Sequence, residues 1–399
     1  MSKTEYRAVI GKNFGDEGKG LATDFLCDKA YKNLVVRANG GAQSGHTVET
    51  KTKRFVFHEL SSGSFKKADT YWADTYHPDL YKLSEEVNDF KEVSGFTPRI
   101  FSHKDAGITT ILDVLLNMAF EKARGDNRHG SCAMGIYETE LREKAGLKIT
   151  LGDLSSLGVK GLCDKLFEIK DNYIPKRIEE ENLSDGIPKE YSDLLNDRNV
   201  LINFSKIVFE NFNLVKVIDK EKAFFNEYDQ VIFENGQGLL LDSECERFYP
   251  NVSGSRTGLT NIEKILSRNN EKLSEVVYVS RSYVTRHGAG YLPTECRSEE
   301  ISGLTKDNTN LPNEWQGSLR YAFHESIDEF VKPVEGDLKA LDYRPKVSLL
   351  LTHLNETKET VMIKDRSLKV DEFINQKEIL KTFDKVYLSE DKYAENIKG

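Results

Sequence analysis

The pattern of apolar and polar positions predicts a sheet built mainly of parallel strands. Short β-prone runs recur along the chain, at residues 5–10, 33–41, 230–238, 275–285, 346–355 and 385–389. Helical spacing of apolar residues follows the first run, and helical stretches separate the later ones. Polar signature residues stand at the carboxyl ends of these runs, where parallel strands share one edge of a sheet. The sequence therefore predicts an α/β fold with a mainly parallel central sheet flanked by helices.

Residues 162–229 differ from the rest of the chain. They are rich in Lys, Glu, Asp and Asn, show helical spacing and have little β propensity. We expect them to form a mostly helical excursion from the sheet. No linker rich in Gly, Ser or Pro, internal repeat or low-complexity tract divides the chain, so a single domain over residues 1–399 is expected.

Composition narrows the classes of partner and compartment. The net charge of -9 argues against broad affinity for nucleic acid or membrane surfaces. No apolar run approaches the roughly 18 residues that span a bilayer, and the first residues show no signal-peptide pattern. Five cysteines without a CxxC pair indicate reduced thiols. We expect a cytoplasmic protein with no nucleic-acid or membrane partner.

The stretch GKNFGDEGKG, residues 11–20, is close to a phosphate-binding P-loop. Three glycines allow the backbone to approach phosphates closely: Gly15, Gly18 and Gly20. Lys19 can supply positive charge, but Gly20 replaces the Ser or Thr whose hydroxyl usually binds magnesium. Asp16 is the nearest oxygen donor for that ion. The alternative is a glycine-rich turn with a solvated acidic pair.

Two further glycine-rich turns follow predicted strands. NGGAQSGHTV contains His46, which can donate a hydrogen bond to a developing oxyanion or phosphoryl oxygen, although a lone histidine is more often structural. FENGQG contains Gln237, which can read the edge of a base or serve as a turn residue. Three arginines near the predicted sheet edge would be costly unless they meet anions: Arg256, Arg281 and Arg286.

These blocks together resemble the adenylosuccinate synthetase family. The matching stretches are FGDEGKG (14–20), GGAQSGHTV (40–48), HELSSG (58–63), EKARG (121–125), GDL (152–154), FENGQGLLLD (233–242), YPNVSGS (249–255) and TRHGAGYLPTE (285–295). They occur in family order, and the similarity thins in the C-terminal part. The pair GDEGKG and GHT is highly specific.

The resemblance implies a ligase that joins aspartate to C6 of a 6-oxopurine nucleotide, IMP by default, at the expense of a nucleoside triphosphate. The implied catalytic residues are Asp16, His46 and Gln237. Asp16 would take the proton from purine N1 and would bind Mg²⁺ together with the backbone carbonyl of Gly45. The 6-oxyanion would then attack the γ-phosphate, with His46 stabilising the transfer, before the aspartate amine displaces phosphate.

The resemblance also assigns binding residues and implies a homodimer. The triphosphate residues are Gly15, Glu17, Gly18, Lys19, Gly20, Thr47, His353 and Asn355. The acceptor-nucleotide residues are Asp16, Gln43, Ser131, Cys132, Arg142, Lys144, Gln237 and Ser253. The amino-acid residues are Thr309 and Arg320.

Departures from the family pattern leave the substrates open. Asn355 in THLN replaces a guanine-binding carboxylate, which favours ATP or dATP over GTP as donor. Residues 306–323 lack the family's arginine cluster, so aspartate binds weakly or another amine is used.

The acceptor segment, residues 128–146, has Ser131 and Cys132 in place of two threonines. Arg142 or Lys144 is expected to replace the arginine that crosses the family's dimer interface. Gln43 and Ser253 also differ from the family residues beside the base and phosphate. Hypoxanthine is therefore not guaranteed, and (d)GMP is the alternative acceptor.

Two other interpretations remain. The departures are similar to those of a phage branch that acts on dGMP, but that branch replaces the loop aspartate with serine, whereas this chain keeps Asp16. From a different class, a catalytically retired paralogue would bind nucleotides without turnover. A general P-loop ATPase or GTPase would hydrolyse the triphosphate without any purine acceptor.

Overall fold

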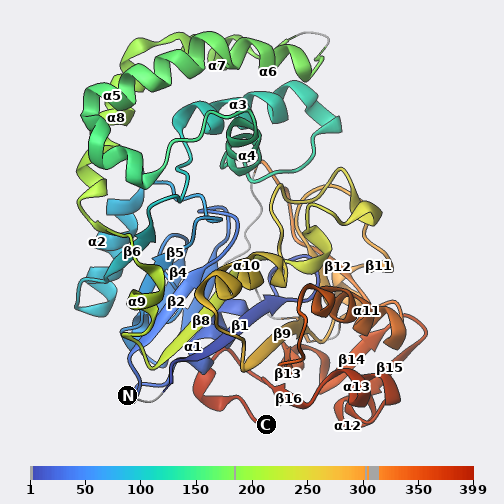
Figure 1. Cartoon of the computed structure of the whole chain (residues 1–399). Helices are drawn as coiled ribbons and strands as arrows, with labels where there is room; N and C mark the ends of the chain where they lie inside the picture. The colour runs from blue at the N-terminus through green and yellow to red at the C-terminus, as the bar shows by residue number, and fades with distance from the viewer. Residues whose placement is uncertain (1–2, 184–185, 302, 305–313) are drawn as a thin grey trace.

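A nine-stranded sheet forms the centre of the protein (Figure 1). The computed structural model describes residues 3–183, 186–301, 303–304 and 314–399. The strands, in spatial order, are β16 (Lys385–Leu388), β13 (Lys346–Thr352), β9 (Glu275–Arg281), β1 (Glu5–Gly11), β8 (Gln230–Gly238), β2 (Asn33–Arg37), β5 (Asp69–Trp72), β6 (Ile100–His103) and β7 (Val215–Ile218). Every neighbouring pair in this sheet is parallel. The predicted α/β class with a mainly parallel sheet is confirmed.

Both faces of the sheet are covered because its central strands are apolar on each side. In β1, Ala8 and Ile10 pack into one hydrophobic cluster and Val9 packs into another. Helices α10 (Leu259–Asn269) and α11 (Ile327–Asp337) cover the first face, and α1 (Lys19–Leu26) covers the second. Burial on both faces is typical of parallel strands joined by helical crossovers.

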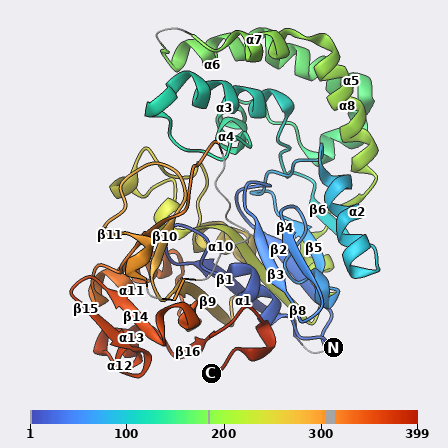
Figure 2. The ribbon, with the colours of Figure 1, turned by 180° about the vertical axis from the view of Figure 1, so that it is seen from behind.

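A helical layer stands apart from the sheet and occupies the top of both ribbon views (Figures 1 and 2). It comprises α3 (Ile111–Arg124), α4 (Ile136–Lys144), α5 (Leu151–Asn172), α6 (Ile174–Glu180), α7 (Lys189–Asn196) and α8 (Arg198–Phe212). The bounds predicted for the excursion, 162–229, need correction. Helix α5 already begins at Leu151, because Thr150 and Asp153 form a capping box there. Residues 215–218 are not helical but form edge strand β7.

Smaller elements surround the sheet. Two hairpins are β3 (His46–Glu49) with β4 (Arg54–Phe57), and β14 (Thr360–Ile363) with β15 (Arg366–Lys369). The predicted strand 275–285 is divided, because β9 ends at Arg281 and β10 (Val284–Arg286) joins β12 (Arg320–Ala322) and β11 (Glu295–Cys296) in a separate sheet. The remaining α-helices are α2 (Leu83–Ser94), α9 (Glu221–Phe225), α12 (Val370–Ile374) and α13 (Lys377–Thr382).

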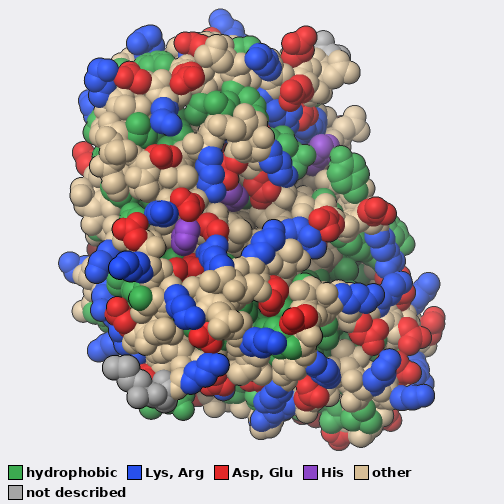
Figure 3. All heavy atoms as spheres, in the orientation of Figure 1, with side chains coloured by type: hydrophobic (Ala, Val, Ile, Leu, Met, Phe, Trp, Pro, Cys, Tyr) green, Lys and Arg blue, Asp and Glu red, His purple; other side chains and the backbone are tan. Residues whose placement is uncertain are grey.

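Acidic and basic side chains are intermixed on the face drawn in Figure 3. All five cysteines are free thiols, as their spacing predicted. Across the described part of the chain, no helix combines the length and the apolar character that crossing a membrane requires.

Candidate functional site

Loops from five neighbouring strands meet at the carboxyl edge of the sheet. In the loop after β1, residues 12–18, the Glu17 carbonyl accepts a hydrogen bond of 2.7 Å from the Thr352 hydroxyl at the end of β13. Arg281, at the end of β9, donates to the Asp16 carbonyl at 2.5 Å. The turn after β2 and the end of β8 are joined by a 2.9 Å hydrogen bond from the Gly236 amide to Asn39 Oδ1. The predicted convergence of glycine-rich loops is therefore observed.

Glu17 holds the first loop in shape from the inside. Its Oε1 accepts hydrogen bonds from the amides of Asn13 and Gly15, at 3.0 and 2.8 Å. Its Oε2 accepts from Lys19 Nζ at 2.7 Å, and both side chains are buried. Burial opposes ionisation, but the attraction of Lys19 and the hydrogen bonds lower the pKa of Glu17. Glu17 thus belongs to the loop's framework, and Lys19 is paired with it rather than projecting to solvent.

Gly20 lies where β3 crosses the start of α1. A Cβ at this position would be 3.0 Å from the Thr47 carbonyl oxygen and 3.1 Å from the Cβ of His46. These separations are tighter than ordinary van der Waals contact. The glycine therefore allows the close approach of the two predicted triphosphate segments.

Asp16 is the carboxylate that the loop leaves available. Its backbone is left-handed, with φ 61°, and its side chain is 23% exposed. Oδ2 lies 3.7 Å from Nε2 of His287. Mg²⁺ commonly binds through one or two carboxylates together with substrate phosphates and water. Asp16 can supply such a carboxylate. No cluster of three or more His, Cys, Asp or Glu ligands occurs among the described residues, and the Gly45 carbonyl stays a predicted ligand.

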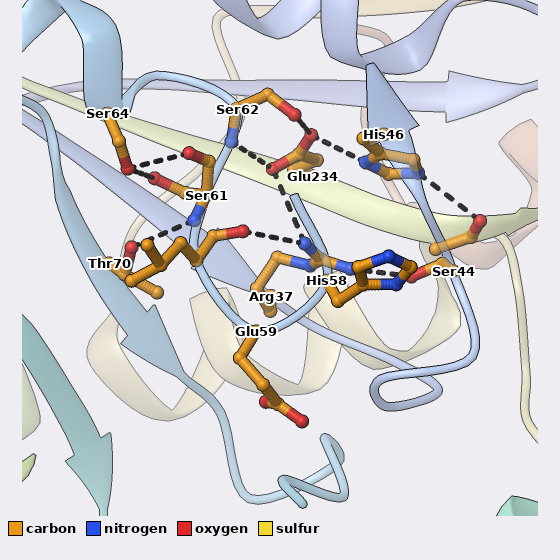
Figure 4. A network of polar contacts seen from close by, with 12 residues as sticks. Arg37, Ser44, His46, His58, Glu59, Ser61, Ser62, Ser64, Thr70 and Glu234 are labelled. Atoms are coloured by element: carbon orange, nitrogen blue, oxygen red, sulfur yellow. Dashed lines mark hydrogen bonds and ion pairs between the residues drawn. The ribbon is translucent and has the colours of Figure 1, made fainter. Parts of the chain in front are cut away.

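His46 is held by a buried polar network (Figure 4). Its Nδ1 lies 2.7 Å from Oε1 of Glu234, and its Nε2 lies 3.4 Å from the Gly236 carbonyl. The Ser62 amide donates to Oε2 of Glu234 at 3.1 Å, and the Ser62 hydroxyl donates to Oε1. Burial would raise the pKa of Glu234, but His46, Arg37 and Ser62 lower it to about 2. An ionised Glu234 therefore keeps a proton on Nδ1 and turns Nε2 toward Gly236 near the end of β8.

Arg37 provides the second cation of this network. It is fully buried, with Nη1 4.0 Å from Oε2 of Glu234. It also donates to the Leu60 carbonyl at 3.2 Å and to Ser44 Oγ at 2.6 Å. The candidate residues chosen from sequence omit Glu234, Arg37 and Ser62. For Arg37 and Glu234 the sequence did offer a signal, because each is a charged residue in an otherwise apolar strand, NLVVR and QVIFE.

The predicted acceptor residues are brought near the first loop by a contact between two glycine turns. A Cβ at Gly288 would lie 2.5 Å from the Gly130 carbonyl oxygen, so segment 128–135 packs directly on the turn after β10. In that segment Ser131 accepts a hydrogen bond from Asn117 Nδ2 at 2.9 Å. Burial raises the pKa of the Cys132 thiol to about 11.

Other acceptor candidates stand at turns. Gln237 is half-buried near the end of β8. Oε1 of Gln43 is buried and has no hydrogen-bond partner among the described residues. The Ser253 hydroxyl accepts from the Ser255 amide at 3.2 Å. Gln43 thus keeps a buried acceptor without a hydrogen-bond partner among the described residues.

The expectation that Arg142 reaches across a dimer interface is wrong. The side chain is fully buried, and Nε lies 2.9 Å from Oδ1 of Asp113. It also donates to the Leu147 and Ile108 carbonyls, at 2.7 and 2.9 Å. A buried guanidinium with all these partners joins α4 to α3 and cannot reach outward. Lys144 is exposed, 3.9 Å from Glu140, and remains a candidate for the interface role.

Arg320, predicted to bind the amino acid, supports the glycine turn after β10. It forms a double hydrogen bond with Glu295, at 2.8 and 2.6 Å. Its Nη1 donates to the carbonyls of Gly288 and Gly290, at 3.1 and 2.8 Å. Its guanidinium is therefore already engaged, while the other predicted amino-acid residue, Thr309, lies outside the described residues.

The predicted base-binding stretch for the triphosphate adjoins the first loop. A Cβ at Gly18 would lie 3.3 Å from Thr352 Cγ2. His353 has a left-handed backbone, with φ 58°, and its Nδ1 lies 2.9 Å from Thr352 Oγ1. Asn355 is exposed. The stretch therefore lies beside the loop and presents an amide to solvent.

Of the three arginines expected to meet anions, Arg256 does so, lying 2.9 Å from Asp242 and 2.8 Å from Glu244. Arg281 instead donates to the Asp16 carbonyl and to the Tyr283 hydroxyl. Arg286 donates to the carbonyls of Asn251 and Tyr291, at 2.6 and 2.7 Å. These two cations shape the site through backbone oxygens.

The fold and the site define an α/β protein with glycine-rich loops at the carboxyl edge of a parallel sheet. The family model for adenylosuccinate synthetase matches residues 8–313, and the chain belongs to that family. The adenylosuccinate synthetase of Clostridium botulinum (strain Alaska E43 / Type E3) is 32% identical over 299 residues, covering 73% of this chain and 66% of that protein. That of Picrophilus torridus is 28% identical over 295 residues, with coverage of 73% and 66%. The matches thus span about two thirds of these relatives.

Two solved structures share the fold. Fully ligated adenylosuccinate synthetase from Plasmodium falciparum superposes with a TM-score of 0.72 and 17% identity, covering 98% of each chain. The cyanophage S-2L succinoaminodeoxyadenylate synthetase, bound to dGMP and to dATP as an energy donor, gives a TM-score of 0.63 and 14% identity, covering 99% of this chain and 95% of that one.

Proposed function

We propose that this protein is a ligase that joins aspartate to C6 of a 6-oxopurine nucleotide at the expense of a nucleoside triphosphate. The observation that carries the proposal is the arrangement of two side chains in a chain of this family. Asp16 presents an available carboxylate on the first loop, and the adjoining β3 holds His46 against a buried, ionised Glu234.

Asp16 would act first, as the base that removes the purine N1 proton. The lactam oxygen of the base is a poor leaving group, and loss of this proton makes it a nucleophile for the γ-phosphate. The loop is suited to this role because Glu17 fixes its amides and Arg281 holds the Asp16 carbonyl. Positioning of this kind supplies a large part of the rate enhancement in such reactions.

His46 would stabilise the phosphoryl transfer. Glu234 fixes the Nδ1 proton, so Nε2 is the nitrogen available to the transferred group. A negative phosphoryl group beside Nε2 favours the imidazolium form, and Glu234 stabilises that form from behind. The 6-oxygen thus becomes a phosphoryl ester, and the nucleoside diphosphate departs.

Asp16 and the Gly45 carbonyl would hold Mg²⁺, which would neutralise part of the negative charge of the phosphates.

The aspartate amine then attacks C6, the C–O bond breaks, and phosphate leaves with the 6-oxygen. The amine loses its proton, which gives the C6-amino-acid nucleotide, nucleoside diphosphate and phosphate. Arg320 and Thr309 remain the proposed amino-acid residues, although the Glu295 contact must loosen for Arg320 to bind a carboxylate.

Within this class, IMP is the default acceptor and (d)GMP the alternative. The exposed amide of Asn355 supports ATP or dATP as donor, because an amide can pair with adenine whereas guanine favours a carboxylate. A homodimer and a cytoplasmic location are proposed from the family.

The test is formation of the C6 adduct. The protein is incubated with Mg²⁺, ¹⁵N-aspartate, ATP or GTP, and IMP, GMP or dGMP in turn, and products are identified by mass spectrometry. A labelled adduct with at least one acceptor is expected. The absence of an adduct with every acceptor would contradict the proposal, and triphosphate hydrolysis without an acceptor would indicate a general NTPase.

Asp16→Asn should lower the rate of adduct formation about 10²-fold or more, because the amide cannot accept the N1 proton. Steady-state rates measured for the best acceptor check this. Asp171→Asn, on the exposed surface of α5, is a matched control expected to leave the rate unchanged. Undiminished turnover by Asp16→Asn would remove Asp16 from the mechanism.

A further inference from the structure

Helix α3 carries a stripe of buried polar side chains along one face. Asp113, Asn117 and Glu121 are spaced four residues apart, so they lie on the same side of the helix. Their exposed fractions are 1%, 7% and 2%. Most residues between them are apolar, and buried polar groups need hydrogen-bond partners. The partners of this stripe therefore indicate what the helix holds in place.

The stripe holds α4 and segment 128–135 against α3. Its first member, Asp113, is the buried partner of Arg142 on α4. Its last member, Glu121, accepts hydrogen bonds at Oε2 from the amides of Gly130 and Ser131, at 2.8 and 3.3 Å. These two amides are occupied by the protein itself and do not serve a ligand.

Asn117, in the middle of the stripe, is bound to two points of the same segment. Its Oδ1 accepts a hydrogen bond from the Gly135 amide at 3.1 Å. A backbone amide can only donate, so this bond fixes which end of the Asn117 side chain is the oxygen. Nδ2 is therefore the donor in the 2.9 Å contact with the Ser131 hydroxyl. Gly135 allows this approach, because a Cβ there would lie 2.6 Å from the Val114 amide nitrogen.

These contacts determine the polarity of the Ser131 hydroxyl. Its oxygen accepts from Asn117 and also from the Ala133 amide, at 3.3 Å, which uses both of its lone pairs. The hydroxyl hydrogen is left over, and within the described part of the chain no hydrogen-bond acceptor takes it. A half-buried hydroxyl in this state can serve a ligand only as a donor.

We propose that Asn117 is a positioning residue for the acceptor nucleotide, which it serves by directing the Ser131 hydroxyl proton toward the 5′-phosphate. This proposal rests on the ligase function proposed above, in which Ser131 belongs to the acceptor-nucleotide residues. Phosphate oxygens only accept hydrogen bonds, whereas the ribose hydroxyls also donate. The 6-oxygen also only accepts, but in the proposed reaction it meets the γ-phosphate beside His46. Repulsion by Glu121 is offset by Arg124, whose Nη1 lies 3.0 Å from Oε1 of that carboxylate.

The experiment measures what the phosphate contributes to binding. Calorimetry on the full chain gives dissociation constants for GMP against guanosine and for IMP against inosine. Each nucleotide should bind more tightly than its nucleoside. In Asn117→Leu and in Ser131→Ala this preference should fall about tenfold, the value expected for one lost hydrogen bond to a charged group. The double variant should fall little further, because Asn117 acts through Ser131.

Asn117→Asp changes the polarity of the contact while keeping the size of the side chain. Its carboxylate still accepts from the Gly135 amide but draws the Ser131 proton inward, so the nucleotide preference should fall at least tenfold. The fall should be smaller in the Ser131→Ala background. Asn211→Leu is the matched control, since this buried asparagine on α8 donates to the Leu80 carbonyl at 2.7 Å. It should lower Tm and leave the preference unchanged.

A purely structural role for Asn117 would weaken nucleotide and nucleoside equally. An unchanged preference in both Asn117 variants, or losses that multiply in the Asn117→Leu, Ser131→Ala double variant, would overturn the inference. So would a wild type that binds each nucleotide no more tightly than its nucleoside. Adduct formation is measured on the same proteins. Adducts together with an unchanged preference contradict the positioning role alone, whereas a changed preference without any adduct contradicts the ligase function and leaves the phosphate contact in place.

Discussion

Glu234 and His46 form a buried pair in which the carboxylate determines the orientation of the ring. The 2.7 Å contact to Nδ1 and the two hydrogen bonds from Ser62 leave the carboxylate little freedom. Arg37, fully buried, gives a nearby positive charge. Such a carboxylate behind a histidine usually matters nearly as much as the histidine itself, because it fixes the tautomer and stabilises the charged ring.

Glu234→Gln should lower kcat for adduct formation about 10²-fold or more. The amide keeps the size of the side chain but removes the charge that stabilises the imidazolium and can offer an N–H to Nδ1. Steady-state kinetics and ATP binding by calorimetry test this, with binding expected to change much less than kcat. Glu244→Gln, an exposed partner of Arg256, serves as control. Unaltered kcat in Glu234→Gln would show that His46 needs no charged partner.

At the residue scale, position along a motif was enough to predict which edge of the sheet a residue lies at. Asp16 lies in the loop after β1, and His46 begins β3 after the turn that follows β2, so both are carried to the common edge of the sheet. The role assigned to Arg142 failed because burial depends on a contact distant in sequence, the one with Asp113 on α3. Similarly, the sequence gives no indication that Lys19 would turn inward to Glu17 or that His287 would lie beside Asp16.

At the scale of elements, the apolar pattern of the sequence did not predict β5, β6 and β7, which form one side of the sheet. β5, β6 and β7 have four residues each, and polar residues interrupt their apolar pattern. β7 was assigned to the helical excursion because VKVI lies between long helical stretches. Its Val215 packs instead with the helical layer's core, which includes Val208 of α8. Short edge strands of this kind depend on tertiary pairing, which local pattern does not encode.

The segment after β5 is joined to α4 by a buried charge cluster. His77 Nδ1 lies 3.3 Å from Glu143 and Nε2 lies 3.8 Å from Glu140. Lys148 and Lys144 approach the same carboxylates, at 3.3 and 3.9 Å. Burial alone would lower the pKa of His77, but the two glutamates close to its ring nitrogens raise it to about 9. The imidazolium is therefore the form that connects the sheet to the helical layer.

Stability should consequently fall at alkaline pH. A folded pKa of about 9 lies above the ordinary value of 6.5, so the contribution of His77 is complete below pH 6.5 and is lost as the pH rises through 9. The difference corresponds to about 3 kcal/mol of unfolding free energy. Urea unfolding from pH 6 to pH 10 measures it. In His77→Gln this part of the pH dependence should disappear, and an identical slope in the variant would refute the assignment.

At the scale of the whole molecule, nucleotide binding should stabilise several elements together. The candidate triphosphate site combines the loop after β1, the start of β3 and the end of β13, which lie far apart in the sequence. A ligand held by all three can bind only when the sheet is assembled. Binding energy is then added to the free energy of unfolding, by about 2.7 kcal/mol at 100 times the dissociation constant.

The preferred triphosphate donor can be measured from how much each nucleotide stabilises the folded protein. At equal concentrations with Mg²⁺, ATP and dATP should raise Tm by a few degrees more than GTP does, because Asn355 offers an amide where guanine requires a carboxylate. Differential scanning calorimetry measures the shifts. Asn355→Asp should move the preference toward GTP. A larger shift with GTP than with ATP in the unmodified protein would contradict the predicted donor.

The crowding around Gly20 restricts how this loop could have arisen or could be redesigned. Besides the Thr47 carbonyl and the His46 Cβ, the Ser62 hydroxyl would lie 3.2 Å from any Cβ placed there. Installing the serine or threonine of a conventional nucleotide loop would require these neighbours, including the strand that carries His46, to yield by a few tenths of an ångström. Exchanging one mode of cation binding for the other therefore calls for compensating changes in the neighbouring strand as well as a new hydroxyl at position 20.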